Sequence, residues 1–273
     1  MPEPDRSPVP FESATQVRPL GDAQFAWSVP DGWQQGRGAW GGLVVAAVVR
    51  AAQACEPDPE RTVRTVSLQI MTPALVGGHH LAVRPVRIGS AMSTWSVSLT
   101  TDVGEPVAQA VVIAGAPRAG APPDAALAAV QPPTAGAPDD AMRVPVGPPS
   151  PVFMQHLHMR LIEGMPLSGS SATTLGWLGY DDAPQPDAAS LLALVDGWWP
   201  ASLPALTQVP RIATVNFTAN LLVDPASVDP GDLLLSQTFV SAASDGFTSE
   251  HRRLWTPDGR LAVDNLQTLV ISA

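Results

Sequence analysis

Apolar and polar residues alternate along much of this chain, and the period of the alternation predicts strands with one long helix among them. The first predicted strand, DAQFAWSV at 22–29, precedes a segment with glycines at 32, 36, 38, 41 and 42. The apolar run LVVAAVVRAAQAC then has the length and alanine content of a buried helix. Four segments rich in Val, Leu and Thr follow, separated by turns that contain glycine, and they predict an antiparallel meander: Thr62–Met71, His79–Ile88, Met92–Thr101 and Pro106–Ala114.

The same order of elements recurs after a break in composition. Residues 115–150 are dominated by Pro, Ala and Gly, which predicts a semi-rigid linker with at most a short helix near Asp124–Val130. Beyond the linker we expect a helix at Ala188–Trp199, two strands before it and four after it: Phe153–Leu161, Ala172–Tyr180, Val209–Leu222, Leu233–Ser241, Phe247–Thr256 and Leu261–Ile271.

The pattern therefore predicts an α+β protein built from two tandem copies of one unit. Each copy is an antiparallel β-meander sheet wrapped around a long central helix. We expect residues 1–20 to form a loose arm, 21–114 the N-terminal unit, 115–150 the linker and 151–273 the C-terminal unit.

Composition removes several kinds of site. The 273 residues are 45% hydrophobic, enough for a sizeable core, and the net charge of −10 argues against a nucleic-acid or anionic-membrane surface. No lysine is present, which excludes a phosphate-loop lysine and a Schiff-base lysine. The single cysteine, Cys55, excludes internal disulfides and cysteine-based zinc sites. A thiol at a helix end is more often inert than nucleophilic.

Targeting and metal signals are weak. The N-terminus MPEPDRSPVP does not resemble a signal peptide, and the apolar run from Gly41 to Val49 is too short to span a bilayer. His156 and His158 alternate on one strand face, where a polar face is a simpler interpretation than a metal site. We therefore expect a soluble cytoplasmic protein without a metal or cofactor.

Asp196 is the most unusual residue of the predicted elements. It lies in the last turn of the second predicted helix, between Leu194-Val195 and Trp198-Trp199. A helix C-terminus carries partial negative charge, so a carboxylate there is disfavoured by about 0.3–1 kcal/mol when exposed and by more when buried. We expect something to compensate for this, and a catalytic role is one candidate.

Two further polar residues interrupt apolar strand faces. By two-residue alternation Thr214 shares a face with Ile212 and Asn216 in the strand RIATVNF, and Gln267 shares a face with Leu269 in the last strand. Taken alone, each is more often solvent-facing than functional.

These segments together resemble the double hotdog acyl-CoA thioesterases of the bacterial thioesterase II type, over about residues 20–273. The segments that carry the resemblance are GAWGGLVVAAVVRAA, PRIATVNF, TPDGRLAV and DNLQTLVI. The resemblance implies hydrolysis of acyl-CoA to a carboxylic acid and CoA, with an aspartate, a threonine and a glutamine around a catalytic water. Carried over residue by residue, these fall on Asp196, Thr214 and Gln267. The family often has Asp-His where this chain has Asn216-Phe217.

The resemblance also suggests where an acyl-CoA substrate binds. Backbone N–H groups of Gly41 and Gly42 could bind the oxyanion, although close backbone packing explains these glycines equally well. CoA phosphates would bind arginines such as Arg84 and Arg87, with Arg64, Arg252 and Arg253 as further candidates. Each of these arginines could equally be an ordinary surface charge.

Alignment of the two closing hairpins places Val112 of the first unit opposite Gln267, so we expect one active site per chain, with the first unit shaping an acyl channel. Two alternatives stay open, namely a non-catalytic acyl-binding protein and an enoyl-CoA hydratase. The hydratase uses an Asp-x-x-x-x-His pair, and no histidine here has an aspartate five positions before it. Exposed sheet edges and family behaviour favour a homo-oligomer.

Overall fold

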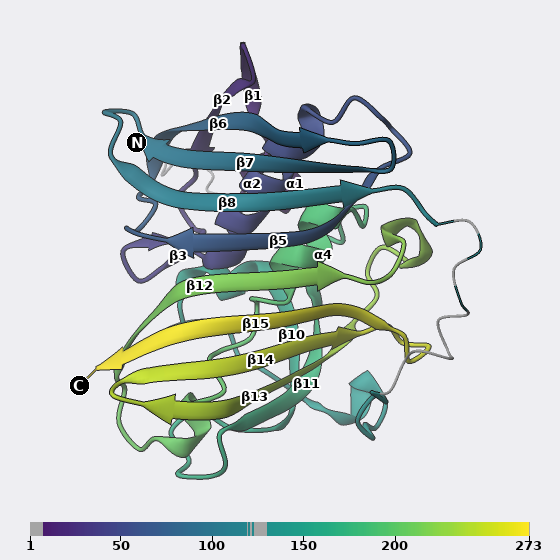
Figure 1. The fold of residues 1–273 in the computed structure, drawn as a ribbon. Coiled ribbons are helices and arrows are strands. Elements are labelled where there is room, and N and C mark those ends of the chain that lie inside the picture. Colours follow the sequence, from purple (N-terminus) through teal and green to yellow (C-terminus); the bar gives the residue numbers. More distant parts are fainter. Residues whose placement is uncertain (1–7, 119, 121, 123–129, 273) are drawn as a thin grey trace, which may run out of the picture.

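The computed structural model describes residues 8–118, 120, 122 and 130–272. One antiparallel sheet of 13 strands runs through these residues in the order β1-β2-β6-β7-β8-β5-β12-β15-β14-β13-β11-β10-β9. It curves around two helices, with the first unit in the upper half of Figure 1 and the second in the lower half. The two units meet edge to edge, because β5 pairs with β12 and places Leu68 opposite Phe217.

The first unit contains the meander that the sequence predicts. Its elements are β2 (Gln24–Val29), the short hairpin β3 (Gln34–Gln35) and β4 (Gly38–Ala39), α2 (Gly41–Ala54), β5 (Thr62–Ile70), β6 (Gly77–Ile88), β7 (Met92–Thr101) and β8 (Pro106–Gly115). Ten of the 14 residues of α2 are buried, because the helix is covered by the sheet and also by the helix of the second unit.

The second unit repeats this order. Its elements are β9 (Met142–Arg143), β10 (Leu157–Glu163), β11 (Thr173–Tyr180), α4 (Ala188–Leu194), β12 (Arg211–Leu221), β13 (Leu234–Ser244), β14 (Phe247–Trp255) and β15 (Leu261–Ser272), with 3₁₀ turns at Pro138–Asp140, Val152–His156, Leu203–Ala205 and Pro225–Ser227. The turn at Val152–His156 replaces the first residues of the strand expected at Phe153–Leu161.

The expectation of a long central helix is wrong for the second unit, because α4 ends at Leu194. A capping box formed by Asp187 and Ser190 begins the helix, with Ser190 N donating to Asp187 Oδ1 at 2.6 Å. After Leu194 the chain turns away. The carbonyl of Trp198 and the N–H of Ala201 bond to side chains of β14 instead of extending the helix.

The two helices cross where α2 begins. A Cβ atom on Gly42 would lie 2.6 Å from the carbonyl oxygen of Ala193 in α4, so only glycine allows this approach. Because of this contact, the start of the first unit's helix lies directly beside the end of the second unit's helix.

The expectation of a loose N-terminal arm is wrong for its described part. α1 (Phe11–Ala14) and β1 (Arg18–Gly21) are ordered elements, and Phe11 is fully buried. Its ring packs on Tyr180 at a centroid distance of 4.5 Å, and its N–H donates to Asp182 Oδ2 at 2.7 Å. An apolar side chain within a proline-rich segment thus anchors that segment to the second unit.

The expected linker also contributes to the fold, because β9 within it pairs with β10 at the sheet edge. The short helix expected near Asp124–Val130 falls almost entirely on residues that lie outside those described. Within the described part of the chain, we find no helix with the length and apolar character needed to cross a membrane.

Candidate active site

Asp196 lies two residues beyond the end of α4 and faces the first turn of α2. Its side chain is buried, with 8% exposure. A Cβ atom on Gly41 would lie only 2.6 Å from Asp196 Oδ2, and the N–H of Gly42 lowers the pKa of this carboxylate. The indole of Trp40 donates to the main-chain oxygen of Asp196 at 3.0 Å. The positive end of a neighbouring helix therefore offsets part of the cost of placing this carboxylate at a helix C-terminus.

The structure brings Asp196, Gln267 and Thr214 into one hydrogen-bonded chain. The amide Nε2 of Gln267 donates to Asp196 Oδ1 at 2.8 Å. The hydroxyl of Thr214 donates to Gln267 Oε1 at 3.2 Å. Gln267 is fully buried, which makes it an internal polar group and not a solvent-facing one. Three residues from separate elements of the second unit therefore lie side by side.

A β-bulge in β12 decides the direction of Thr214. Thr214 pairs with Leu269 and Phe217 pairs with Gln267, with a shift of register between Thr214 and Asn216. The expectation that Thr214 and Asn216 share a face is therefore wrong. Without the extra residue, alternation back from the inward-facing Phe217 would turn Thr214 to the outer surface.

Arg252 completes the surroundings of the carboxylate. Its Nη1 donates to Asp196 Oδ1 at 3.2 Å and to the carbonyl of Trp198 at 3.0 Å, while its Nε donates to Glu250 Oε1 at 2.7 Å. The other oxygen of Glu250 accepts from the N–H of Ala201 at 2.7 Å. Arg252 and Glu250 are 2% and 0% exposed, so this ion-pair network is internal.

Burial and Arg252 shift the pKa values of Asp196 and Glu250 in opposite directions. Burial raises the pKa of Asp196, while Arg252, Gln267 and the N–H of Gly42 lower it, with a net upward shift. The pKa of Glu250 is also raised, mainly by burial and against the lowering effect of Arg252. With both carboxylates ionised, the three buried charges sum to −1.

Sequence reasoning missed Glu250 and misplaced Arg252. The suggestion that Arg252 binds a CoA phosphate is wrong, because its guanidinium is internal and already paired. Inward-facing Glu250 and Arg252 alternate with His251 and Arg253, and Arg253 pairs with Asp264. Because both faces of this strand carry charged or polar residues, alternation alone could not tell which face is buried.

The other predicted binding residues lie in two places. Gly41 and Gly42 border the site, where the N–H of Gly42 lowers the pKa of Asp196, and binding of an oxyanion by these glycines stays a prediction. Arg84 and Arg87 are exposed on β6. Four strand spacings separate β6 from β12, about 19 Å at ~4.8 Å each. The structure does not bring these arginines to Asp196, and their role in binding CoA stays a prediction.

Apolar residues occupy the corresponding positions of the first unit. Val63 pairs with Ala114 beside a bulge, as Thr214 pairs with Leu269, and Val66 pairs with Val112, as Phe217 pairs with Gln267. Val63 and Val112 therefore stand where the second unit has Thr214 and Gln267. Both valines are buried and border a small cavity of about 170 Å³.

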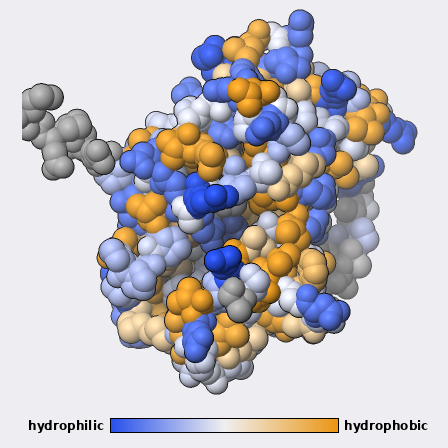
Figure 2. All heavy atoms as spheres, turned by 90° about the vertical axis from the view of Figure 1, so that its left-hand side faces the viewer, coloured by the Kyte–Doolittle hydropathy of each residue, from blue (hydrophilic) through white to orange (hydrophobic). Residues whose placement is uncertain are grey.

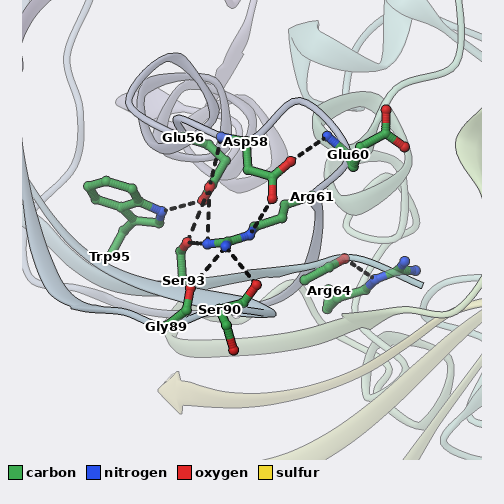
Figure 3. A network of polar contacts seen from close by, with 10 residues as sticks. Glu56, Asp58, Glu60, Arg61, Arg64, Gly89, Ser90, Ser93 and Trp95 are labelled. Atoms are coloured by element: carbon green, nitrogen blue, oxygen red, sulfur yellow. Dashed lines mark hydrogen bonds and ion pairs between the residues drawn. The ribbon is translucent and has the colours of Figure 1, made fainter. Parts of the chain in front are cut away.

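The same cavity is bordered by a polar network of the first unit (Figure 3). Glu56 accepts from the indole of Trp95 at 3.0 Å and from the hydroxyl of Ser93 at 3.1 Å. Arg61 contacts Glu56 at 3.5 Å and donates to the carbonyl of Gly89 at 2.9 Å. These bonds tie the end of α2 to β7, and the network has no counterpart of the Thr214–Gln267 chain.

The surface is hollowed on the side of the molecule where β12 begins and β15 ends (Figure 2). Figure 2 views this side and shows the surface hollowed between the two halves, with hydrophilic and hydrophobic residues around the hollow. A cavity of about 390 Å³ lies at these strand ends and is lined by the loop 206–210 together with Ile271 and Ser272. Ile271 pairs with Ile212, two residues before Thr214 along β12.

Two tandem units, in each of which an antiparallel sheet curves around a helix, define a class of protein, the double hotdog proteins. Models of known families match both units. The model of the acyl-CoA thioesterase N-terminal domain matches residues 29–115, and that of the C-terminal domain matches residues 123–271. The chain therefore belongs to the acyl-CoA thioesterase family and is a thioester hydrolase.

Solved structures share the fold of this chain. A conserved hotdog protein of unknown function from Alicyclobacillus acidocaldarius is 27% identical, with a TM-score of 0.87 and coverage of 96% of this chain and 98% of that one. The acyl-CoA thioesterase II TesB2 from Mycobacterium marinum is 16% identical, with a TM-score of 0.76 and coverage of 96% and 97%. The tesB protein from Mycobacterium avium subsp. paratuberculosis is 13% identical, with a TM-score of 0.75 and coverage of 96% and 98%. A search of curated proteins finds no significant match.

Proposed function

We propose that this chain hydrolyses acyl-CoA with a water molecule that Asp196, Thr214 and Gln267 hold and activate. The observation that carries the proposal is the continuous chain of hydrogen bonds from the Thr214 hydroxyl through the Gln267 amide to the Asp196 carboxylate. A buried carboxylate with a raised pKa is suited to take a proton near neutral pH.

Each group has a defined part in the reaction. Asp196 takes a proton from water, and the resulting hydroxide attacks the carbonyl carbon of the thioester. The hydroxyl of Thr214 donates a hydrogen bond to Gln267 Oε1, so the lone pairs of the hydroxyl oxygen are free to accept a hydrogen bond from the water. Gln267 holds Asp196 and Thr214 at a fixed separation, which lowers the entropic cost of aligning the water.

Collapse of the tetrahedral intermediate needs little further assistance. The carbon–sulfur bond breaks, the carboxylic acid forms and CoA leaves as a thiolate. A thiol has an ordinary pKa of about 8.5, so the leaving group departs without a dedicated general acid. The proton held by Asp196 passes to the thiolate or to solvent, and the carboxylate is restored.

Attack by an enzyme thiol is a poorer explanation. Burial raises the pKa of Cys55, the only thiol of the chain, and therefore disfavours its nucleophilic thiolate form. Cys55 lies at the end of α2, away from the start of that helix where Asp196 is bound. A water nucleophile needs only the three residues that the structure assembles.

The test is release of free thiol from acyl-CoA esters of graded chain length. We expect Asp196→Asn and Gln267→Ala to lower kcat by at least about 10²-fold, as losses of a general base and of its positioning partner do. Thr214→Val removes one hydroxyl at nearly constant volume, and we expect a loss of about 10-fold or more.

Thr218→Val is the matched control for Thr214→Val, because Thr218 lies on the same strand and bonds to Ser67 instead of to the site. If the wild-type protein binds acyl-CoA but releases no thiol at any chain length, the chain is an acyl-CoA-binding protein and the proposal fails. Equal turnover in Asp196→Asn and wild type would also refute it.

A further inference from the structure

Two buried charges beside Asp196 have no part in the reaction as described so far. Arg252 binds Asp196 Oδ1, the carbonyl of Trp198 and Glu250 Oε1 through its Nη1 and Nε atoms. Trp198 and Ala201 belong to the turn that follows Asp196. Arg252 and Glu250 of β14 therefore bond to the main chain of this turn at two points. The network therefore fixes the main chain around Asp196 as well as its carboxylate.

The sign of each charge affects the ionisation of Asp196 strongly because the groups are buried. A cation 3.2 Å from Asp196 Oδ1 favours the ionised carboxylate, and the nearby anion Glu250 opposes that effect by pairing with the same cation. Burying an ion pair is costly, and apolar side chains of similar volume in its place are often at least as stable. A role in setting the state of Asp196 accounts for keeping these charges.

Building on the proposed function, we propose that Arg252 and Glu250 are positioning residues for hydrolysis. Arg252 orients the Asp196 carboxylate and holds it ionised, and Glu250 restrains Arg252 so that the carboxylate still accepts a proton from water.

The other elements around Asp196 bring no competing charge to it. The segment AASLLAL of α4 has no charged residue, and the first turn of α2 has no acidic side chain but presents the N–H of Gly42. On β15 the group that faces Asp196 is the neutral amide of Gln267, while Asp264 pairs with Arg253. On β12 the neighbouring group is the hydroxyl of Thr214. Among the described residues, Arg252 is thus the charge in contact with Asp196, and the repulsion between the two carboxyl groups raises the pKa of Glu250.

The experiment measures two properties of wild type, Arg252→Gln and Glu250→Gln. The first is the pH profile of kcat for thiol release. The second is the pH titration of the ¹³C carboxyl resonance of Asp196 in the full-length protein, assigned by its absence in Asp196→Asn. Arg260→Gln is the matched control, because Arg260 pairs with Asp258 and not with Asp196.

We expect the two variants to shift in opposite directions. Loss of the cation in Arg252→Gln moves the acid limb of the profile and the titration midpoint to higher pH. The ratio of activity at pH 6 to activity at pH 9 then falls by about tenfold or more. Loss of the anion in Glu250→Gln moves both to lower pH. Arg252→Lys keeps the charge but not the forked geometry, so it should retain the acid limb while lowering kcat.

The outcomes separate this inference from the proposed function. If wild type releases thiol but the midpoints of all variants coincide, or both variants shift in one direction, the positioning role is refuted and the function stands. If wild type releases no thiol while the midpoints separate as expected, the proposed function fails and the electrostatic coupling stands. If Arg252→Gln does not fold, Glu250→Gln and Arg252→Lys decide the question. A Glu250→Gln midpoint that coincides with wild type, or a wild-type kcat in Arg252→Lys, overturns the inference.

Discussion

Gly41→Ala tests whether the first unit's helix fixes the position of the second unit's carboxylate. The added Cβ would lie 2.6 Å from Asp196 Oδ2, whereas ordinary contacts begin at 3.4 Å. The carboxylate must therefore move by 3.4 − 2.6 = 0.8 Å, away from α2. It has little freedom to do so, because Gln267 and Arg252 hold the opposite oxygen at 2.8 and 3.2 Å.

A displacement of this size predicts a large loss of rate with little change in stability. Misplacing a catalytic group by about 1 Å costs up to about 10²-fold, so we expect kcat to fall by about 10- to 100-fold, equivalent to about 1.4–2.7 kcal/mol. The backbone of Gly41 is not in the left-handed region. Alanine favours a helix over glycine by about 0.5–1 kcal/mol, which offsets part of the steric cost.

The assay combines thiol release with thermal unfolding. Gly136→Ala is the control, because the nearest atom to its added Cβ is 3.7 Å away and lies in Asp140. Wild-type kcat in Gly41→Ala would show that the carboxylate does not need its position beside α2. If Gly41→Ala does not fold, Gly41 is needed only for packing between the two helices. Either result refutes the reasoning.

Three further predictions concern stability. Burial raises the pKa of Asp196, so the folded protein binds its proton more tightly than the unfolded chain, and this stabilisation is lost as pH rises through the folded-state pKa. Asp196→Asn should therefore have a higher Tm than wild type at pH 8, and the difference should disappear toward pH 3.8. An equal or lower Tm at pH 8 would contradict the expected increase in stability. Phe11→Ala should cost about 3–5 kcal/mol in urea unfolding, because the ring is fully buried, whereas the control Glu12→Ala should change stability by less than about 0.5 kcal/mol. Trp40→Phe removes the 3.0 Å bond to the main chain of Asp196 and should cost about 1 kcal/mol in the same measurement; an unchanged midpoint would show that this bond contributes nothing.

Local pattern was enough to predict most elements of the fold. Period-two alternation predicted the meanders within a few residues, and the alanine-rich run after Gly41-Gly42 predicted α2. The resemblance to acyl-CoA thioesterases supplied Asp196, Thr214 and Gln267, and the family models confirm the family while the structure brings the three side chains together. Their roles in catalysis stay predictions.

The remaining features depended on contacts between distant segments, which local pattern does not contain. The bulge beside Thr214 follows from pairing with β15 and reverses the face that simple alternation predicts. The early end of α4 follows from side chains of β14 that bind the turn beyond it. Phe11 looked like part of a loose arm because its partners Trp33 and Tyr180 are far away in the sequence.

Asp196 shows both sides of this division. Its place in the amino-acid sequence already shows that a carboxylate follows an apolar helix, which is unfavourable at the negative end of a helix dipole. What compensates for it is visible only in the folded chain, because the positive end of α2, the amide of Gln267 and the cation of Arg252 come from three other elements. A buried charge depends on the groups that surround it in space, and those groups are set by how the two units pack against each other.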